Sequence, residues 1–346
     1  MEVASIFLNR VLSEAAKKGA SNLHLSVGSF PMVKINGELK QIQNENILTL
    51  DTLNQIIDSL IDNKDENLKK QKELTIVKDF ADNLRFKINI FYQKGLPVLS
   101  FSYINNSIIK DSKKIPDILE NSIDLSSGLL IVGGSNYSGK TTTIASVIEK
   151  INQKNKKYII TIENPIEYLF VNKESIIEQR EVKKDTKSYL NAIKHCLDED
   201  VDLVYIDSIK DDFGLAIPYI LELAGSNTLV ILEMNTKDSI NTLEKILNFS
   251  GDSLKESISY SLADVLLGIV IQKLIPGRGE MLVANEVLVS NPAIKSLIKE
   301  RKISSIKNII QTSKGEGMII MERSIKELVE KKKITKDEAK NLGYKF

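Results

Sequence analysis

Residues 129–143 of this chain read LLIVGGSNYSGKTTT, in which four apolar residues precede a glycine-rich loop. The loop at residues 134–141 fits the pattern G-x-x-x-x-G-K-[ST]. Backbone N–H groups in such a loop, and at the N-terminus of the helix after it, converge on phosphate oxygens. A chance match in a surface loop is the alternative. The strand pattern before the loop and the helical pattern of residues 142–151 after it favour a nucleotide-binding α/β fold.

Each residue type in the loop has a chemical task in nucleotide binding. The glycines let the backbone approach the phosphates, Lys140 bridges the terminal phosphates, and the Thr141 hydroxyl ligates Mg²⁺. ATP and Mg²⁺ are therefore the predicted cofactors. Tyr137 stands where many such loops have glycine, and a positive φ there would cost on the order of 1 kcal/mol. The predicted nucleotide contacts are Gly134, Ser135, Asn136, Tyr137, Ser138, Gly139, Lys140, Thr141 and Thr142.

The patterns on either side of the loop divide the chain into parts. Residues 1–104 mix short strand and helix patterns, which is typical of a small α+β domain. Residues 105–116 are polar, lysine-rich and aperiodic, which indicates a linker at residues 105–120. Residues 121–290 alternate buried apolar runs with helical stretches, as in an α/β domain on a largely parallel sheet. Residues 291–346 have a helical pattern.

Two local signals predict where elements end. Asn36-Gly37 is a hairpin turn signal before the short strand pattern that follows it. Thr335 and Glu338 have the spacing of a capping box, which predicts the start of a last short helix.

The composition is that of a globular protein and argues against several other classes. The 346 residues include 47 Lys+Arg and 46 Asp+Glu, so no global field would attract nucleic acid. Cys196 is the only cysteine, which leaves no disulfide framework or cysteine-rich metal site. The longest apolar stretch, residues 265–271, is far shorter than the ~20 residues that cross a bilayer. We expect a cytoplasmic chain without direct membrane insertion.

Three further segments carry a resemblance to a known family. Residues 20–26 (ASNLHLS) look like A-S-D-L-H-L-S, and residues 179–186 (QREVKKDT) look like Q-R-E-V-x-x-D-T. Residues 293–300 (AIKSLIKE) look like A-I-R-N-L-I-R-E. The spacing between these segments is also kept. The chain resembles the type IV pilus retraction ATPases (PilT-type), within the type II/IV secretion ATPases, almost end to end.

The resemblance implies an N-terminal PAS-like domain and a RecA-like P-loop ATPase core with C-terminal helices. It also implies a hexameric ring, made of this chain alone or mixed with a paralogous ATPase. The implied membrane partner is the inner-membrane pilus platform protein, so the chain would lie peripherally at the inner face of the membrane. Hydrolysis in such a ring drives pilus retraction and twitching motility.

The catalytic motifs of that family are only partly kept. Its T-I-E-D-P-I-E segment corresponds to TIENPIE here, so Asn164 replaces the aspartate. Glu163 is kept, and the resemblance implies that it positions the attacking water. The family's Walker B strand ends in G-E, whereas this chain has Asp207 followed by Ser208. Asp207 either reaches Mg²⁺ through a water or only caps the next turn, and the residue pattern leaves both open.

Other family residues that support hydrolysis are replaced. Residues 227–236 (NTLVILEMNT) correspond to G-H-L-V-F-G-T-L-H-T and contain neither histidine. Two further family arginines correspond to Ser102 and Asp198. The family's R-F-R corresponds to residues 85–87, where Arg85 either acts across a subunit interface or is a solvated strand residue.

These losses weaken hydrolysis more than binding. We therefore expect an ATP-binding motor-type subunit of a type IV pilus machine with impaired hydrolysis, in which Glu163, Asp207 and Arg85 are the catalytic candidates. Thr141 and, through a water, Asp207 are the metal candidates. The alternative is a catalytically weak accessory subunit that works with an intact paralogous ATPase. A RecA-like DNA translocase is less favoured, because the near-neutral charge argues against nucleic acid.

Overall fold

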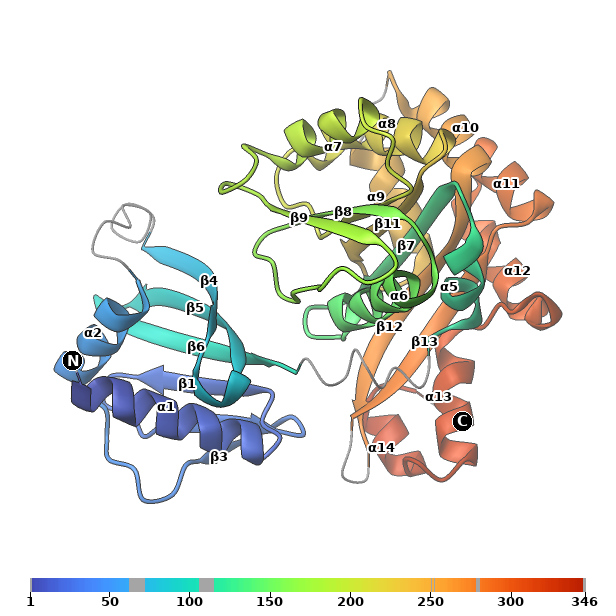
Figure 1. Cartoon of the computed structure of the whole chain (residues 1–346). Helices are drawn as coiled ribbons and strands as arrows, with labels where there is room; N and C mark the ends of the chain where they lie inside the picture. The colour runs from blue at the N-terminus through green and yellow to red at the C-terminus, as the bar shows by residue number, and fades with distance from the viewer. Residues whose placement is uncertain are drawn as a thin grey trace. The chain divides into compact units, whose positions relative to one another are not determined.

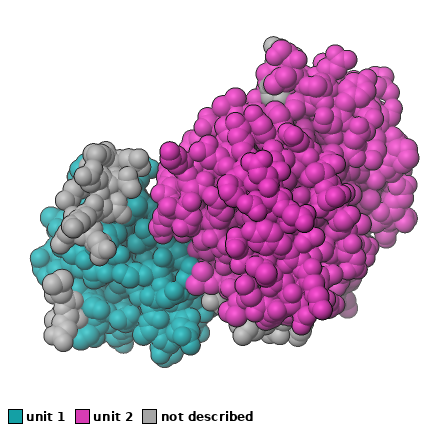
Figure 2. All heavy atoms as spheres, turned by 45° about the horizontal axis from the view of Figure 1, so that its top comes forward, with its two compact units in different colours: residues 1–107 teal, residues 108–346 magenta. Residues whose placement is uncertain are grey.

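The structure of the protein is a computed structural model that describes residues 2–61, 72–105, 115–249, 251, 253–277 and 281–344. The chain divides into two compact units, residues 1–107 and 108–346 (Figure 2). Most of the expected linker, residues 106–114, lies outside the described residues.

The first unit packs two helices against an antiparallel sheet (Figure 1). In its described part the strand order is β3-β2-β1-β6-β5-β4. Leu12 of α1, Ile56 of α2 and Phe101 of β6 are buried in one core. Asn36 and Gly37, both at positive φ, form the turn between β2 and β3 that their sequence predicts. The elements are α1 (Glu2–Lys17), β1 (Asn22–Ser26), β2 (Met32–Ile35), β3 (Glu38–Gln41), α2 (Leu50–Leu60), β4 (Glu73–Asp79), η1 (Ala81–Asn83), β5 (Arg85–Gln93) and β6 (Leu96–Ile104).

The second unit is built on a sheet whose described strands lie in the order β13-β12-β7-β11-β10-β8-β9. Neighbouring strands are parallel except β12 and β13, which confirms the predicted largely parallel sheet. The carboxyl ends of β7, β11, β10 and β8 meet at one edge, where open α/β sheets bind ligands. The strands are β7 (Gly128–Gly134), β8 (Tyr158–Glu163), β9 (Ile176–Glu181), β10 (Leu203–Ile206), β11 (Leu229–Asn235), β12 (Leu266–Pro276) and β13 (Met281–Val289).

Helices cover both faces of this sheet, because successive residues of a buried strand point to opposite sides. On β7, Leu130 and Val132 belong to the core that includes α6, whereas Leu129 and Ile131 belong to the core that includes α7 to α10. The unit is therefore the expected RecA-like α/β domain (Figure 1). The helices that precede or connect its strands along the chain are α5 (Asp117–Asn121), η2 (Ser122–Asp124), α6 (Lys140–Lys154), α7 (Tyr189–Leu197), α8 (Phe213–Gly225), α9 (Ser239–Phe249) and α10 (Lys255–Val265).

Two regions outside the sheet belong to the same unit. Residues 117–120, expected from sequence to lie in the linker, form most of α5, because Leu119 is buried against the α6 side of the sheet. The C-terminal helices share the other core, and α14 begins at the capping box of Thr335 and Glu338. They are α11 (Pro292–Lys299), η3 (Ile303–Ser305), α12 (Ile306–Thr312), η4 (Lys314–Glu316), α13 (Met321–Glu330) and α14 (Lys336–Asn341). Across the described ranges, no helix combines the length and apolar character needed to cross a membrane.

Candidate nucleotide-binding site

The glycine-rich loop joins the carboxyl end of β7 to α6, and its shape requires glycine at two positions. Gly139 has φ 83° and is the N-cap of α6. A Cβ on Gly134 would lie 2.5 Å from the carbonyl oxygen of Gln272 on β12. Lys140 is the first residue of α6, so the free backbone N–H groups of this helix N-terminus lie at the loop.

The middle of the loop is exposed and strained at one residue. Ser135, Asn136 and Tyr137 are exposed, whereas Ser138 is buried. Tyr137 has φ 61°, the left-handed conformation that strains a non-glycine residue by about 1–2 kcal/mol. Its side chain is 67% exposed, so burial does little to offset this strain.

The side chains that begin α6 have partners elsewhere in the second unit. Nζ of the buried Lys140 donates to the carbonyl oxygen of Ser135 at 2.9 Å. Thr141 Oγ1 donates to Glu233 Oε2 at 2.9 Å. The hydroxyls of Thr142 and Tyr168 are hydrogen-bonded at 2.9 Å. Of these contacts, the one between Thr141 and Glu233 ties the start of α6 to strand β11.

Gln272 on β12 fastens the loop to α6, and its sequence context did not reveal this role. Gln272 Nε2 donates to the carbonyl oxygen of Ser138 at 2.7 Å, and its Oε1 accepts from Thr143 Oγ1 at 2.8 Å. The Ser138 hydroxyl oxygen is buried and has no hydrogen-bond partner in the described structure. A buried hydroxyl of this kind is expected to have a partner, so Ser138 leaves donor capacity for a ligand.

Glu233 is a carboxylate that contacts the start of α6, and the sequence motifs do not reveal it. It lies on β11 and is buried. Its Oε1 is 3.7 Å from Lys140 Nζ, and Tyr205 OH donates to its Oε2 at 3.1 Å. Burial raises the pKa of the Glu233 carboxyl, although the Lys140 charge opposes that shift. One sequence signal was present: Glu233 interrupts the apolar run of residues 229–234.

Glu163 lies at the carboxyl end of β8, two strands away from β11 in the sheet order. Its buried Oε1 accepts from Thr161 Oγ1 at 2.6 Å and from Gln179 Nε2 at 3.3 Å. Burial, with the nearby charge of Asp207, raises the pKa of Glu163 to about 8. The carboxyl is therefore mostly protonated at neutral pH.

Asp207 follows β10 and holds the turn after the neighbouring strand. Its Oδ2 accepts from the backbone N–H of Asn164 at 2.9 Å, and its Oδ1 accepts from Tyr189 OH. Burial, followed by the nearby carboxyl groups of Glu233, Glu163 and Asp207, raises the pKa of Tyr205 on β10. The ends of three strands thus bring these carboxylates to one edge of the sheet.

Arg85 belongs to the first unit. It begins β5, is buried, and its Nη1 donates to both carboxylate oxygens of Asp79 at 2.8 Å. Because Arg85 is buried and paired, it is not the solvated strand residue that was one of its two predicted roles.

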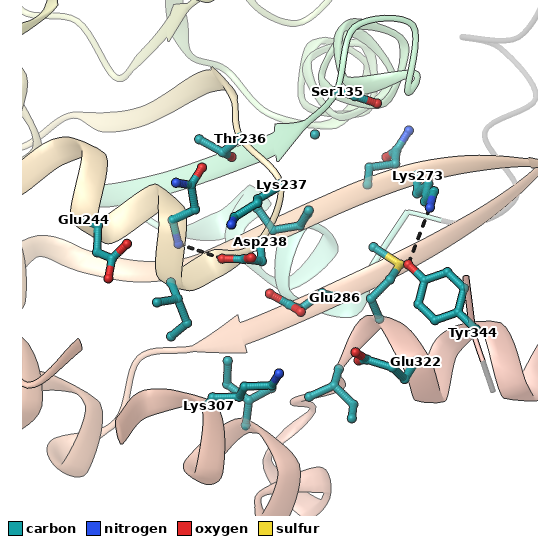
Figure 3. Close-up of a pocket in the computed structure, with 18 of the residues that line it drawn as sticks. Ser135, Thr236, Lys237, Asp238, Glu244, Lys273, Glu286, Lys307, Glu322 and Tyr344 are labelled. Carbon is teal, nitrogen blue, oxygen red and sulfur yellow. Dashed lines mark hydrogen bonds between the residues drawn. The ribbon is translucent and has the colours of Figure 1, made fainter. Parts of the chain in front are cut away.

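A cavity of about 700 Å³ begins at the loop and lies within the second unit (Figure 3). Gly134 and Ser135 line one part of it, and Tyr344 lines another, where Lys273 Nζ is 3.5 Å from the tyrosine hydroxyl. Glu286 and several lysines also line it, so the cavity carries both signs of charge. Its position makes it candidate space for a ligand that is held at the loop.

Comparison with known proteins places the chain in a family. A model of the family described as type II/IV secretion system protein matches residues 96–342. The chain belongs to the type II/IV secretion system protein family. It is a PilT-type member: the type IV pilus retraction ATPase PilT of Pseudomonas aeruginosa is 28% identical over 96% of this chain and 97% of its own length. A twitching motility protein of Neisseria gonorrhoeae is 29% identical over 86% of this chain and 80% of its own.

The solved structures agree with this placement in the family. A crystal structure of the pilus retraction motor PilT with bound ADP superposes with a TM-score of 0.79 and 31% identity, covering 96% of this chain and 95% of that one. The ATPase DotB of Legionella pneumophila has a TM-score of 0.81 at 19% identity, covering 97% and 95% of the two chains, which shows a shared fold. The family membership predicted from the segment resemblance is therefore confirmed.

Proposed function

We propose that this chain is an ATP-binding motor subunit of a type IV pilus machine in which ATP hydrolysis is slow. The observation that carries the proposal is the loop itself, which presents a helix N-terminus, the Lys140 ammonium and an unpartnered Ser138 hydroxyl at one place. The similarity to a retraction motor that binds ADP supports the same class of ligand.

The side chains of the loop suit the phosphates of ATP. Lys140 Nζ donates a hydrogen bond to the Ser135 carbonyl oxygen and lies near Glu233. Rotation about the bonds of its flexible four-carbon side chain would turn the ammonium toward a bound phosphate. The backbone N–H groups at the start of α6 meet the phosphate oxygens. The adjoining cavity, which Gly134 and Ser135 line, supports the proposal as space for the nucleotide beyond its phosphates.

The residues beside the loop fit Mg²⁺. Its preferred ligands are oxygens, and Thr141 Oγ1 and the Glu233 carboxylate supply them 2.9 Å apart. The described residues include no group of three or more His, Cys, Asp or Glu side chains that could hold a metal ion. Mg²⁺ usually needs only one or two protein ligands beside substrate phosphates. When bound, this ion would neutralise charge that develops on the transferred phosphoryl group.

Several features make turnover slow. Glu163 would orient the attacking water, but a carboxyl with a pKa of about 8 is a weak proton acceptor at neutral pH because most of it already carries the proton. Ser208, Thr228 and Asn235 replace family residues that assist hydrolysis. Removing single stabilising groups of this kind lowers phosphoryl transfer by large factors.

The assembly that we propose is a hexameric ring, with this chain alone or mixed with a paralogous ATPase. In this ring Arg85 would exchange its ion pair with Asp79 for a contact across a subunit interface. The ring would contact the inner-membrane platform protein of the pilus from the cytoplasmic side. The losses at Ser208, Thr228 and Asn235 favour a second candidate function, a catalytically weak accessory subunit that relies on an intact paralogue.

Binding and turnover measured side by side test the proposal. We expect the purified protein to bind a fluorescent ADP analogue, and Lys140→Ala to weaken that binding about 10–100-fold through loss of a charge-assisted contact. Equal binding by wild type and Lys140→Ala would show that the phosphate site is misassigned. Rapid Mg²⁺-dependent hydrolysis of ATP by the chain alone would contradict the proposal that its turnover is slow. Hydrolysis that needs an added PilT-type paralogue would support the accessory role.

A further inference from the structure

We propose that Glu233 is the carboxylate that holds Mg²⁺ together with Thr141, so that the metal is supported from β11 and not from the end of β10. This inference rests on the proposed binding of nucleotide at the loop. It assigns to Glu233 a function that no sequence motif of the chain indicates.

The first argument is the contact between the two side chains. Glu233 Oε2 accepts a hydrogen bond from Thr141 Oγ1 at 2.9 Å. In P-loop enzymes the metal is held by the loop Ser or Thr and by a carboxylate from a nearby strand. A carboxylate that already bonds this hydroxyl lies within reach of a metal on the same hydroxyl, directly or through one water. Glu233 has the position that such a carboxylate requires.

The second argument is the way in which the strands hold Glu233. β11 pairs with β7 in parallel, with Glu233 opposite Val132 and Asn235 opposite Gly134, the first residue of the loop. Tyr205 OH on β10 donates to the same carboxylate oxygen as Thr141. Hydrogen bonds from Thr141 on α6 and Tyr205 on β10 therefore hold the Glu233 carboxylate in place before any ligand binds. An oxygen positioned in advance in this way favours metal binding.

The third argument is electrostatic. Glu233 is buried, and its nearest recorded positive charge is Lys140 Nζ, 3.7 Å from Oε1. A lysine that turns toward phosphate leaves this buried carboxylate with less compensation, which is unfavourable in a low-dielectric site. Glu233, together with Thr141, would then hold a divalent cation, whose charge would restore the balance beside this buried carboxylate.

The fourth argument is an exchange of residue types between two adjacent strands. The family pattern has glutamate where this chain has Ser208, and threonine where this chain has Glu233. β10 and β11 are hydrogen-bonded neighbours whose last paired residues are Ile206 and Leu232. Ser208 follows the end of β10, and Glu233 follows Leu232 on β11. This chain therefore has its carboxylate on β11 and a hydroxyl after β10, the reverse of the family pattern.

The experiment measures how much Mg²⁺ tightens nucleotide binding. A fluorescent ADP analogue is titrated into the full chain in excess Mg²⁺ and in EDTA, and the ratio of the two Kd values is the Mg²⁺ gain. Bound Mn²⁺ is counted in parallel by electron paramagnetic resonance. We expect Glu233→Gln to bind the analogue in EDTA at least as tightly as wild type, because a negative charge near the phosphates is gone. Its Mg²⁺ gain should fall by about 10–100-fold.

The matched control is Glu149→Gln. Glu149 is another buried carboxylate of the same unit, on α6, and its recorded partners Lys173, Asn152 and Gln153 are not loop residues. This variant should keep the wild-type Mg²⁺ gain. A double exchange, Glu233→Thr with Ser208→Glu, should recover part of the gain that Glu233→Thr alone loses. Recovery by the double exchange keeps the test valid if Glu233→Gln does not fold.

The outcomes separate this inference from the proposed function. An unchanged Mg²⁺ gain in Glu233→Gln would overturn the role of Glu233 while leaving nucleotide binding intact. Wild-type protein that binds no analogue under either condition would overturn the proposed function itself. Loss of the gain in Glu233→Gln, with binding in EDTA preserved, supports the metal-holding carboxylate on β11.

Discussion

Gln272 Nε2 donates a hydrogen bond to the carbonyl oxygen of Ser138 at 2.7 Å, which ties β12 to the glycine-rich loop across 134 residues of chain. The same side chain accepts from Thr143 on α6. One amide thus sets both the end of the loop and the first turn of the helix. The phosphate-binding geometry therefore depends on a strand that contributes nothing to the loop sequence.

Replacing Gln272 by leucine should lower both stability and nucleotide affinity. The change leaves the Ser138 carbonyl and the Thr143 hydroxyl without these partners, so the free energy of unfolding should fall by about 1–3 kcal/mol. Urea unfolding and titration with a fluorescent ADP analogue measure the two effects. Gln311→Ala, at an exposed position of α12, should change stability by less than about 0.5 kcal/mol. A Gln272→Leu variant that is as stable and binds nucleotide as tightly as wild type would contradict the role of the two Gln272 hydrogen bonds.

The strain at Tyr137 predicts an ordering of two substitutions. Both Tyr137→Ala and Tyr137→Gly remove the exposed ring, but only glycine adopts φ 61° without steric strain. Glycine also raises the conformational entropy of the unfolded chain, which offsets about 0.4–1 kcal/mol of the stability gained by relieving the strain. We expect Tyr137→Gly to be more stable than Tyr137→Ala by up to about 1 kcal/mol in urea unfolding. A glycine variant clearly less stable than the alanine variant would show that the loop stores no such strain.

The raised pKa of Glu163 predicts a pH dependence of stability with a defined sign. In the unfolded chain this carboxyl loses its proton near pH 4.5, whereas in the folded protein it keeps the proton to about pH 8. Between these values the folded state binds more protons, so Glu163 makes stability fall as pH rises, by at most about 1.4 kcal/mol per pH unit. Above about pH 8 the effect levels off.

Glu163→Gln should remove that decline, so the stability difference between the variant and wild type should grow from pH 5 to pH 8 in favour of the variant. Denaturant unfolding at several pH values measures it. If the residual ATP turnover of wild type uses Glu163 as proton acceptor, turnover should rise toward pH 8 and then flatten. Parallel stability curves for the two proteins across this range would contradict a raised Glu163 pKa.

Asp207→Asn separates a structural role from a metal role. One carboxylate oxygen accepts from Asn164 N–H and the other from Tyr189 OH, and an amide cannot accept with its NH₂ group. The variant should therefore lose about 1–3 kcal/mol of stability. The pKa of Glu163 should also fall, because a nearby negative charge is removed. The Mg²⁺ gain in ADP binding should stay within a few-fold of wild type, and a loss as large as that of Glu233→Gln would assign the metal to Asp207.

One boundary expected from sequence differs from the structure. Residues 105–120 are predicted to be a linker because residues 105–116 are polar and aperiodic. Within it, Leu119 packs into a core that it shares with Ile144 and Val147 of α6. Helix α5 forms there because tertiary burial outweighs the weak helical signal of a five-residue segment.

The turns, loops and helix caps that sequence predicts residue by residue are those whose contacts are short-range. The glycine-rich loop between β7 and α6, the Asn36-Gly37 turn and the Thr335–Glu338 capping box each close within a few residues. Backbone sterics and local hydrogen bonds alone decide such features, so their residue types are diagnostic.

Glu233 and Gln272 could not be found in that way. Glu233 is 92 residues from Thr141, and Gln272 is 134 residues from Ser138. An apolar run shows that residues 229–232 form a strand but not which strand lies beside it. The order β12-β7-β11-β10 arises from the packing of both cores, a free energy summed over the whole unit. Only that order places a carboxylate from one strand and an amide from another against the same loop.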